Sequence, residues 1–316
     1  ASSATPTWTR WWPTCKACAK AVSGRKTYWG PATQRALDAQ SISDQRLPPG
    51  MVRALGIVKR AVLAAHRALH PLPARQLGAL LRAAEDVILG GLNAQFPLDP
   101  SQRDAAHDAC ANEVVARRAA ELLGSSDDAF DPPAHVGLGL DPSAGLRAAW
   151  QVALLEAVVQ DVLPPVKELV DELAAQAMSR PEMREALQAQ AAALAHAGAA
   201  LRNASQDLRA VTLGLPEPLD AAAIAHLNDV TRLDHAPGPG GPEAVRAALE
   251  AVKGMANALT GLRAVAGKDV TDGLTVATDG VTSLLGEDGP TVVTASRWLP
   301  ALAAMGRGIE RAGERG

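Results

Sequence analysis

The sequence is poor in aromatic residues and in cysteine, and it has no long apolar run. Aromatic residues make up only 3% of the 316 residues, while 47% are hydrophobic. The core volume must therefore come from Ala, Leu and Val, a composition that favours close-packed helices. Three cysteines do not make a disulfide framework and point to a reducing compartment. A transmembrane helix needs roughly 20 apolar residues, and the best candidate, residues 152–163, is interrupted by Glu156, Gln160 and Asp161.

The sequence also lacks a strong excess of charge of either sign. Its formal net charge is −3 and its isoelectric point is near 6.2. Such a chain has no general attraction for phosphate backbones. Nucleic acid is therefore not expected as a main partner, and any contact with it would be peripheral.

The start of the chain contains no acidic residue before Asp38, and it does not begin with Met. Its first ten residues are rich in Ser and Thr and end in Arg10, as is typical of a mature chain after removal of an organellar transit peptide. A chain whose natural start lies further upstream gives the same pattern. On the first interpretation, we expect the protein on the matrix side of the mitochondrion.

Residues 1–26 form a basic, tryptophan-rich N-terminal arm that is too small to build its own core. One interpretation is that the arm packs its indole rings on the body of the same chain. The other is that it docks on a partner protein, because Trp and Arg anchors concentrate at binding hot spots. The predicted docking residues are Trp8, Arg10, Trp11 and Trp12.

Four short stretches of the sequence match phrases that occur together in one known protein family. They read Trp-Gly-Pro-Ala-Thr-Gln-Arg (29–35), Ala-Ala-Glu-Asp-Val-Ile (83–88), Asn-Glu-Val (112–114) and Asp-Pro-Pro-Ala-His-Val (131–136). Together these phrases resemble the class II fumarase and aspartase family. The resemblance implies a mainly α-helical fold, a tetramer built around a shared helical bundle, and elimination chemistry next to a carboxylate.

Beyond residue 142 the apolar residues recur at helical spacing. Four leucines follow at strict seven-residue intervals, which predicts a seam of a helix bundle; they are Leu187, Leu194, Leu201 and Leu208. Pro164 and Pro165 are expected to distort the long helix that contains them. Ser179, followed by Pro181, is expected to cap the start of the next helix.

The family's catalytic phrases are replaced in this chain. Where the resemblance implies Thr-Gly-Ser-Gly-Thr-Gln-Thr-Asn, residues 101–108 read Ser-Gln-Arg-Asp-Ala-Ala-His-Asp, and the new Asp104 and Asp108 are expected to repel a dicarboxylate. Residues 141–144 read Asp-Pro-Ser-Ala in place of Ser-Ser-Asn-Asp. Residues 131–134 replace the His-Pro-Asn-Asp phrase of a secondary carboxylate site.

Two further family regions have no counterpart in the sequence. No Thr-His dipeptide occurs anywhere, and residues 261–290 contain nothing like the family's Gly-Ser-Ser-x-Met-Pro-x-Lys-x-Asn loop with its catalytic serine. The resemblance implies that three such regions, from three subunits, meet at each active site. We therefore assign no catalytic residue and expect no small-molecule substrate.

One cluster of residue types has metal-ligand character. Cys15 and Cys18 form a Cys-x-x-Cys pair, and His107 and Cys110 are spaced to lie on one face of a helix. Together they predict a structural zinc site with four protein ligands. The alternative is that the cysteines are small core residues. No other cofactor is expected.

These observations predict a mainly α, fumarase/aspartase-like helical fold with a truncated bundle of long helices. We expect the arm at residues 1–26, an N-terminal helical domain at 27–141 and a long-helix bundle domain at 142–316, with an irregular C-terminal part.

The functional expectation is a catalytically inactive fumarase-like protein, a structural or accessory subunit among the other proteins of a large mitochondrial assembly. Candidate assemblies are a respiratory-chain or ATP synthase complex and the mitoribosome. The alternative is an active lyase of the same superfamily with an altered substrate, or a regulatory partner of an active fumarase.

Overall fold

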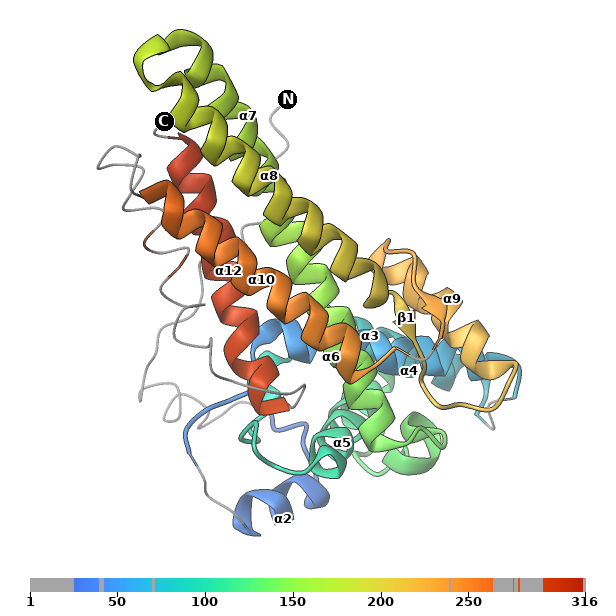
Figure 1. Cartoon of the computed structure of the whole chain (residues 1–316). Helices are drawn as coiled ribbons and strands as arrows, with labels where there is room; N and C mark the ends of the chain where they lie inside the picture. The colour runs from blue at the N-terminus through green and yellow to red at the C-terminus, as the bar shows by residue number, and fades with distance from the viewer. Residues whose placement is uncertain are drawn as a thin grey trace, which may run out of the picture.

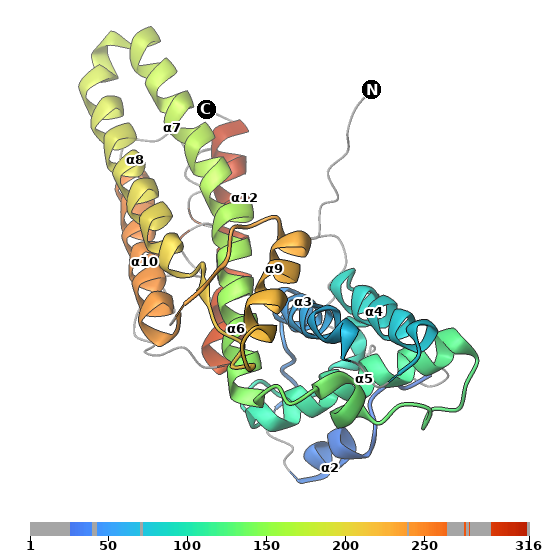
Figure 2. The same cartoon turned by 90° about the vertical axis from the view of Figure 1, so that its right-hand side faces the viewer.

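The protein folds into two groups of helices that share one hydrophobic core (Figures 1 and 2). The computed structural model describes residues 26–39, 43–69, 72–238, 240–263, 275, 278 and 292–314. The mainly helical fold expected from the sequence is confirmed. Within the described ranges, no helix combines the length and apolarity needed to cross a bilayer.

In its described residues, the N-terminal group contains four α-helices with short connecting turns. Its elements are α2 (Pro31–Ala39), α3 (Pro49–Ala65), η2 (His66–Ala68), α4 (Ala74–Ile88), η3 (Asn93–Gln95), α5 (Asp104–Leu123) and the π-helical turn η4 (Pro133–Gly137). Helix α5 ends where Gly124 adopts a left-handed conformation with φ of 67°, a common way to close a helix.

The C-terminal group is dominated by long helices that run side by side (Figure 1). Its elements are α6 (Pro142–Glu156), the π-helical segment η5 (Ala157–Val162), α7 (Leu163–Ser179), η6 (Pro181–Met183), α8 (Arg184–Asp207), β1 (Ala210–Val211), α9 (Leu219–Thr231), β2 (Ala236–Pro237), α10 (Pro242–Arg263) and α12 (Val292–Glu314). Strands β1 and β2 pair in parallel over two residues each.

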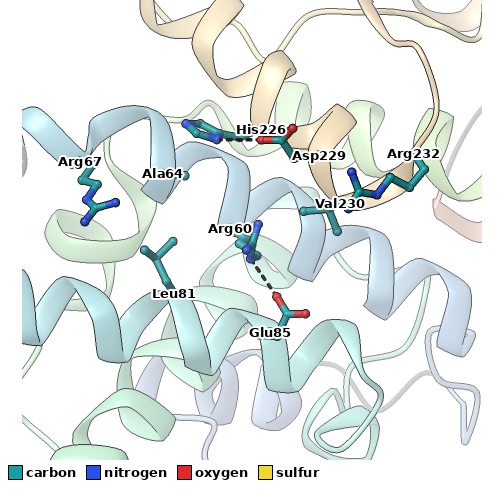
Figure 3. A pocket seen from close by; sticks show the side chains of 9 residues that line it. All are labelled: Arg60, Ala64, Arg67, Leu81, Glu85, His226, Asp229, Val230 and Arg232. Carbon is teal, nitrogen blue, oxygen red and sulfur yellow. Dashed lines mark ion pairs between the residues drawn. The ribbon is translucent and has the colours of Figure 1, made fainter.

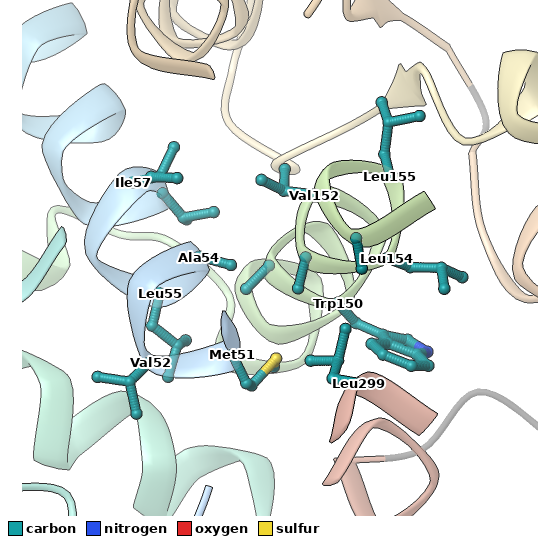
Figure 4. Packing of buried hydrophobic residues seen from close by; sticks show 14 of the residues in the cluster. Met51, Val52, Ala54, Leu55, Ile57, Trp150, Val152, Leu154, Leu155 and Leu299 are labelled. Atoms are coloured by element: carbon teal, nitrogen blue, oxygen red, sulfur yellow. The ribbon is translucent and has the colours of Figure 1, made fainter. Parts of the chain in front are cut away.

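The core joins the two groups where α3 packs against α6 (Figure 4). Met51 and Leu55 of α3 and Trp150 and Leu154 of α6 are all buried, and Leu299 of α12 closes the same cluster. Helix α9 leaves the bundle and packs on α3 (Figure 2). The expected boundary at residue 141 is therefore a change of helix group within one continuous core.

The predicted leucine seam is confirmed, and the predicted cap is not. Each of the four leucines is at most 3% exposed, and α8, which carries this stripe, packs against both α7 and α10. Ser179 instead closes α7, because its hydroxyl donates to the carbonyl oxygen of Gln176 at 3.1 Å. Helix α8 begins only at Arg184, after η6.

The two prolines expected to distort the long helix stand in the first turn of α7, which follows η5. Proline has no N–H to donate, so the carbonyl groups of Gln160 and Asp161, four residues before Pro164 and Pro165, receive no α-helical hydrogen bond from them. The Asp161 carbonyl lies against α12 at Gly306, where an added Cβ would be only 2.0 Å from the Asp161 oxygen. Glycine at this position is what lets the two backbones approach.

Among the residues that the structure describes, two histidines are buried. His107 of α5 is 1% exposed and His235, before β2, is 5% exposed. Burial lowers the pKa of each imidazole from its ordinary value of 6.5 to about 4. Both rings are therefore neutral in the folded protein at neutral pH.

The contact at Gly306 can be tested by adding one methyl group. Gly306→Ala is expected to lower the free energy of unfolding by about 1–3 kcal/mol because the backbones must separate, although Ala normally favours a helix over Gly by about 1 kcal/mol. Gly254→Ala on α10 is the control, because its Cβ would meet nothing within 4 Å. Urea unfolding should show the control unchanged or more stable. A stabilised Gly306→Ala variant would contradict the contact.

The buried histidines predict a loss of stability in mild acid. Unfolded imidazoles take up protons below about pH 6.5, whereas the folded ones resist until about pH 4, so the free energy of unfolding falls as the pH drops through this window. Each histidine contributes about 3 kcal/mol to this fall. His107→Gln should flatten the profile measured by urea unfolding. His196→Gln, which removes an exposed histidine, should leave it unchanged; equal slopes in all three proteins would refute the assignment.

Candidate functional site

Helix α5 carries the buried polar residues around which the N-terminal helices assemble. His107, Asp108, Asn112 and Glu113 lie within two turns of one another, and each is at most 7% exposed. We call these four residues the buried row. Buried polar groups are stable only when they are paired or hydrogen-bonded. The partners of these side chains therefore show how the helix is held.

Asp108 is paired with a buried lysine of α3. The Lys59 ammonium donates to Oδ1 of Asp108 at 2.5 Å, and the Asn112 amide donates to Oδ2 at 2.9 Å. Lys59 is only 1% exposed, and burial lowers its pKa even though Asp108 favours its charged form. The expectation that Asp108 would repel a dicarboxylate is thus wrong, because its charge is compensated inside the protein.

Glu113 connects α5 to the first residues of α2. Its carboxylate accepts hydrogen bonds from the backbone N–H groups of Gly30, Ala32 and Thr33 at 2.8, 2.7 and 3.1 Å, and from the Thr33 hydroxyl at 2.6 Å. A Cβ at Gly30 would lie 2.7 Å from Glu113 Oε1, so only glycine fits there without a shift. The phrases at 29–35 and 112–114, which carry the family resemblance, are therefore in direct contact.

The loop before α5 is ordered by a third buried carboxylate, that of Asp99. Asp99 accepts hydrogen bonds from the backbone N–H of Ser101 at 2.8 Å and from its hydroxyl at 2.5 Å, and also from the Ser43 hydroxyl. Burial alone would raise the pKa of Asp99, but these hydrogen bonds outweigh it and lower the pKa. The loop leaves the side chains of Ser101 and Arg103 exposed at its outer side.

The segment with the expected secondary-site phrase forms a closed turn over α5. Asp131 accepts a hydrogen bond from the Ala134 N–H at 3.0 Å, and its own N–H donates to His135 Nδ1 at 2.9 Å. A Cβ at Gly137 would lie 3.3 Å from the Asn112 amide nitrogen, so η4 packs closely on the buried row. The Asp141 side chain then caps α6 through the N–H of Ala144 at 2.8 Å.

The predicted zinc site is only half within the described residues. His107 and Cys110 are both buried on α5, as their spacing predicts, whereas Cys15 and Cys18 lie outside the described residues. Burial raises the pKa of the Cys110 thiol to about 12, and no hydrogen bond satisfies His107 Nε2 among the described residues.

Across those residues no three His, Cys, Asp or Glu side chains gather as a metal site would require. The zinc site stays a prediction. So does the docking arm of Trp8, Arg10, Trp11 and Trp12, which also lies outside the described residues.

Sequence reasoning missed Lys59 as the partner of Asp108. The signal was present, because Lys59 lies in an apolar helix four residues after Leu55 and three before Val62, both of which are buried. A lysine on such a face requires a buried anion. The pairing with α5 could not be read from spacing, because the two residues are far apart in the chain.

Comparison with known proteins finds similarity to one group of enzymes. No family model matches the chain. The class II fumarate hydratase of Halobacterium salinarum is 40% identical over 150 residues, covering 46% of this chain and 32% of the relative. That of Caulobacter vibrioides is 39% identical over 155 residues, covering 48% and 34%. These matched segments span about a third of the curated relatives' length.

Solved structures extend the similarity to nearly the whole chain. A fumarate lyase:delta crystallin from Brucella melitensis matches with a TM-score of 0.80 and 20% identity, covering 92% of this chain and 83% of the other. A class II fumarase from Schistosoma mansoni matches with a TM-score of 0.78 and 16% identity, covering 91% and 79%. At these identities the likeness shows the fold.

The expectation of a catalytically inactive structural subunit is wrong. The sequence relatives are named as fumarate hydratases and the structural neighbours as fumarate lyases, which points to an enzyme. The expectation rested on replaced phrases, and one of the replacements, Asp108, is compensated by Lys59. The chain has the fumarase/aspartase-like helical fold, and over about half of its length it is similar in sequence to class II fumarate hydratases.

Proposed function

We propose that this protein is a lyase of the fumarase/aspartase superfamily that acts on a substituted dicarboxylic acid. The observation that carries the proposal is that class II fumarate hydratases are similar in sequence to about half of the chain, while a fumarate lyase structure matches its fold over nearly the whole chain. Within this fold, the N-terminal helices hold the compensated Lys59–Asp108 pair and the Glu113 contact with α2.

The proposed reaction is elimination next to a carboxylate. A base removes the proton from the carbon beside the carboxylate, the C–H electron pair becomes the new C=C bond, and the leaving group departs from the neighbouring carbon with its own electron pair. The developing negative charge on the carboxylate requires nearby cations and hydrogen-bond donors. The reverse reaction adds the same group and a proton across the double bond.

The substrate is proposed to differ from that of the relatives because the loop before α5 differs. Arg103 stands where the resemblance implies a serine, and its side chain is exposed. An arginine offers a carboxylate two parallel hydrogen bonds and a full charge, whereas a serine offers one neutral donor. Arg103 is therefore proposed to bind an acidic group of the substrate.

The buried row on α5 is proposed to hold this loop in place. Lys59, Asp108 and Asn112 fix the first turns of α5, and Asp99 orders the residues just before them. A fixed loop lets Arg103 meet the substrate without first being ordered. The resemblance implies that groups from several subunits complete each site, so activity is expected from the assembled protein.

The proposal is tested with purified full-length chain in its native assembly. Malate, aspartate and argininosuccinate differ in their leaving groups but all give fumarate on elimination, so fumarate release reports on all three. We expect one of them to be cleaved. No fumarate from any of them, with a protein of intact helical content, would contradict the proposal.

The role of Arg103 predicts a specific loss. Arg103→Ala should lower kcat/KM by about tenfold or more for the cleaved substrate, because a charge-assisted contact is lost. Arg202→Ala, which removes an exposed arginine of α8, is the matched control and should keep full activity. Equal rates for the two variants would exclude Arg103 from substrate binding.

A further inference from the structure

A pocket of about 550 Å³ lies between α3, α4 and α9, and three arginines line it (Figure 3). Arg60 comes from α3, Arg67 from η2, and Arg232 directly follows α9. Figure 3 shows Arg67 and Arg232 at opposite ends of the pocket, with Arg60 between them. The volume suits a small organic molecule.

The charges in this pocket are not balanced. Arg60 is paired with Glu85 at 2.8 Å, and His226 lies 3.6 Å from Asp229. Among the described residues, neither Arg67 nor Arg232 has an ion-pair partner. Three arginines against two carboxylates leave the pocket with one formal positive charge while His226 is neutral.

Arg232 occupies a backbone position that normally favours another residue. It closes α9 in the left-handed conformation, with φ of 59° and ψ of 24°. Glycine is usual at such a helix end because a Cβ makes this conformation costly. A non-glycine residue in such a conformation points to a functional role for its side chain.

The neighbouring residues Lys59 and Arg60 show that the pocket and the buried row lie on different sides of α3. Its neighbour Lys59 points into the core toward Asp108, whereas Arg60 reaches across to α4 and Glu85. Consecutive residues of a helix project in directions about 100° apart. The buried pair therefore remains closed while the pocket side of α3 is open to a ligand.

We propose that this pocket binds an elongated small molecule with a phosphate group at each end. Arg67 and Arg232 each bind one phosphate, for which the planar guanidinium supplies paired donors. The uncharged middle of the ligand lies against the side chains of Ala64, Leu81 and Val230, which line the pocket between the charged ends. Arg60 turns toward the ligand as Glu85 is displaced.

The placement of Arg67 and Arg232 at opposite ends of the pocket is what selects such a ligand. A single phosphate engages one end only and leaves the other arginine solvated. A bisphosphate of suitable length uses both ends in one binding event, so the second contact costs little additional entropy. This binding does not depend on the proposed lyase activity.

The test is isothermal titration of the full chain with fructose 1,6-bisphosphate, fructose 6-phosphate and inorganic phosphate at physiological salt. The bisphosphate should bind about tenfold or more tightly than either single phosphate, because two charge-assisted contacts replace one. Equal affinity for the three probes, or no binding of the bisphosphate, would overturn the proposal.

Arg232→Gly is the decisive variant, because it removes the cation and also relieves the left-handed conformation. It should weaken bisphosphate binding about tenfold or more, while the thermal midpoint stays the same or rises. Arg246→Ala, at an exposed arginine of α10, should bind normally. Glu85→Gln should bind more tightly, since the acid no longer competes for Arg60. Unchanged binding by Arg232→Gly would refute the site.

Discussion

The carboxylate of Glu113, placed against the first turn of α2, is the interaction on which the N-terminal helices depend. The first N–H groups of a helix have no partner within it, and a negative charge there is favoured by the helix dipole. Glu113 accepts from two of these groups, at Ala32 and Thr33, and also from the N–H of Gly30 just before the helix and from the Thr33 hydroxyl. Arg117, one turn later, donates to the carbonyl oxygen of Trp29 at 2.7 Å. Helix α5 thus binds α2 on one side and, through Asp108, α3 on another.

Much of this framework could be predicted from local sequence, because it follows from the spacing and the chemical type of residues along one helix. The leucine stripe of α8 and the distortion at Pro164 and Pro165 are examples. Contacts between distant segments could not be predicted in this way. Nothing in the spacing of residues places Gly306 on the Asp161 carbonyl or Lys59 beside Asp108. The prediction that Ser179 caps the next helix was wrong because its hydroxyl can equally bind a carbonyl group of the preceding helix.

The expectation of lost activity is contradicted by the relatives named as fumarate hydratases, and part of its basis was mistaken for a related physical reason. A replaced residue was judged by its charge alone, without the groups that surround it in the fold. Asp108 carries a negative charge that the buried Lys59 neutralises, so it does not oppose an acidic substrate. Arg103, by contrast, presents a new cation at the outer side of the same loop. Such changes support the proposal of a lyase with an altered substrate, and the pocket lined by Arg60, Arg67 and Arg232 is proposed as a separate site for anions.

Proton transfer beside a carboxylate is the step that defines the proposed chemistry, and heavy water reports on it directly. The lyase-catalysed addition to fumarate, run in D2O with the leaving group of the cleaved substrate, should give a product with one deuterium at a single stereochemical position beside the carboxylate. Nuclear magnetic resonance of the product measures this. We expect stereospecific incorporation of one deuterium. A product with none, or with deuterium distributed over both positions, would contradict a lyase built on this fold.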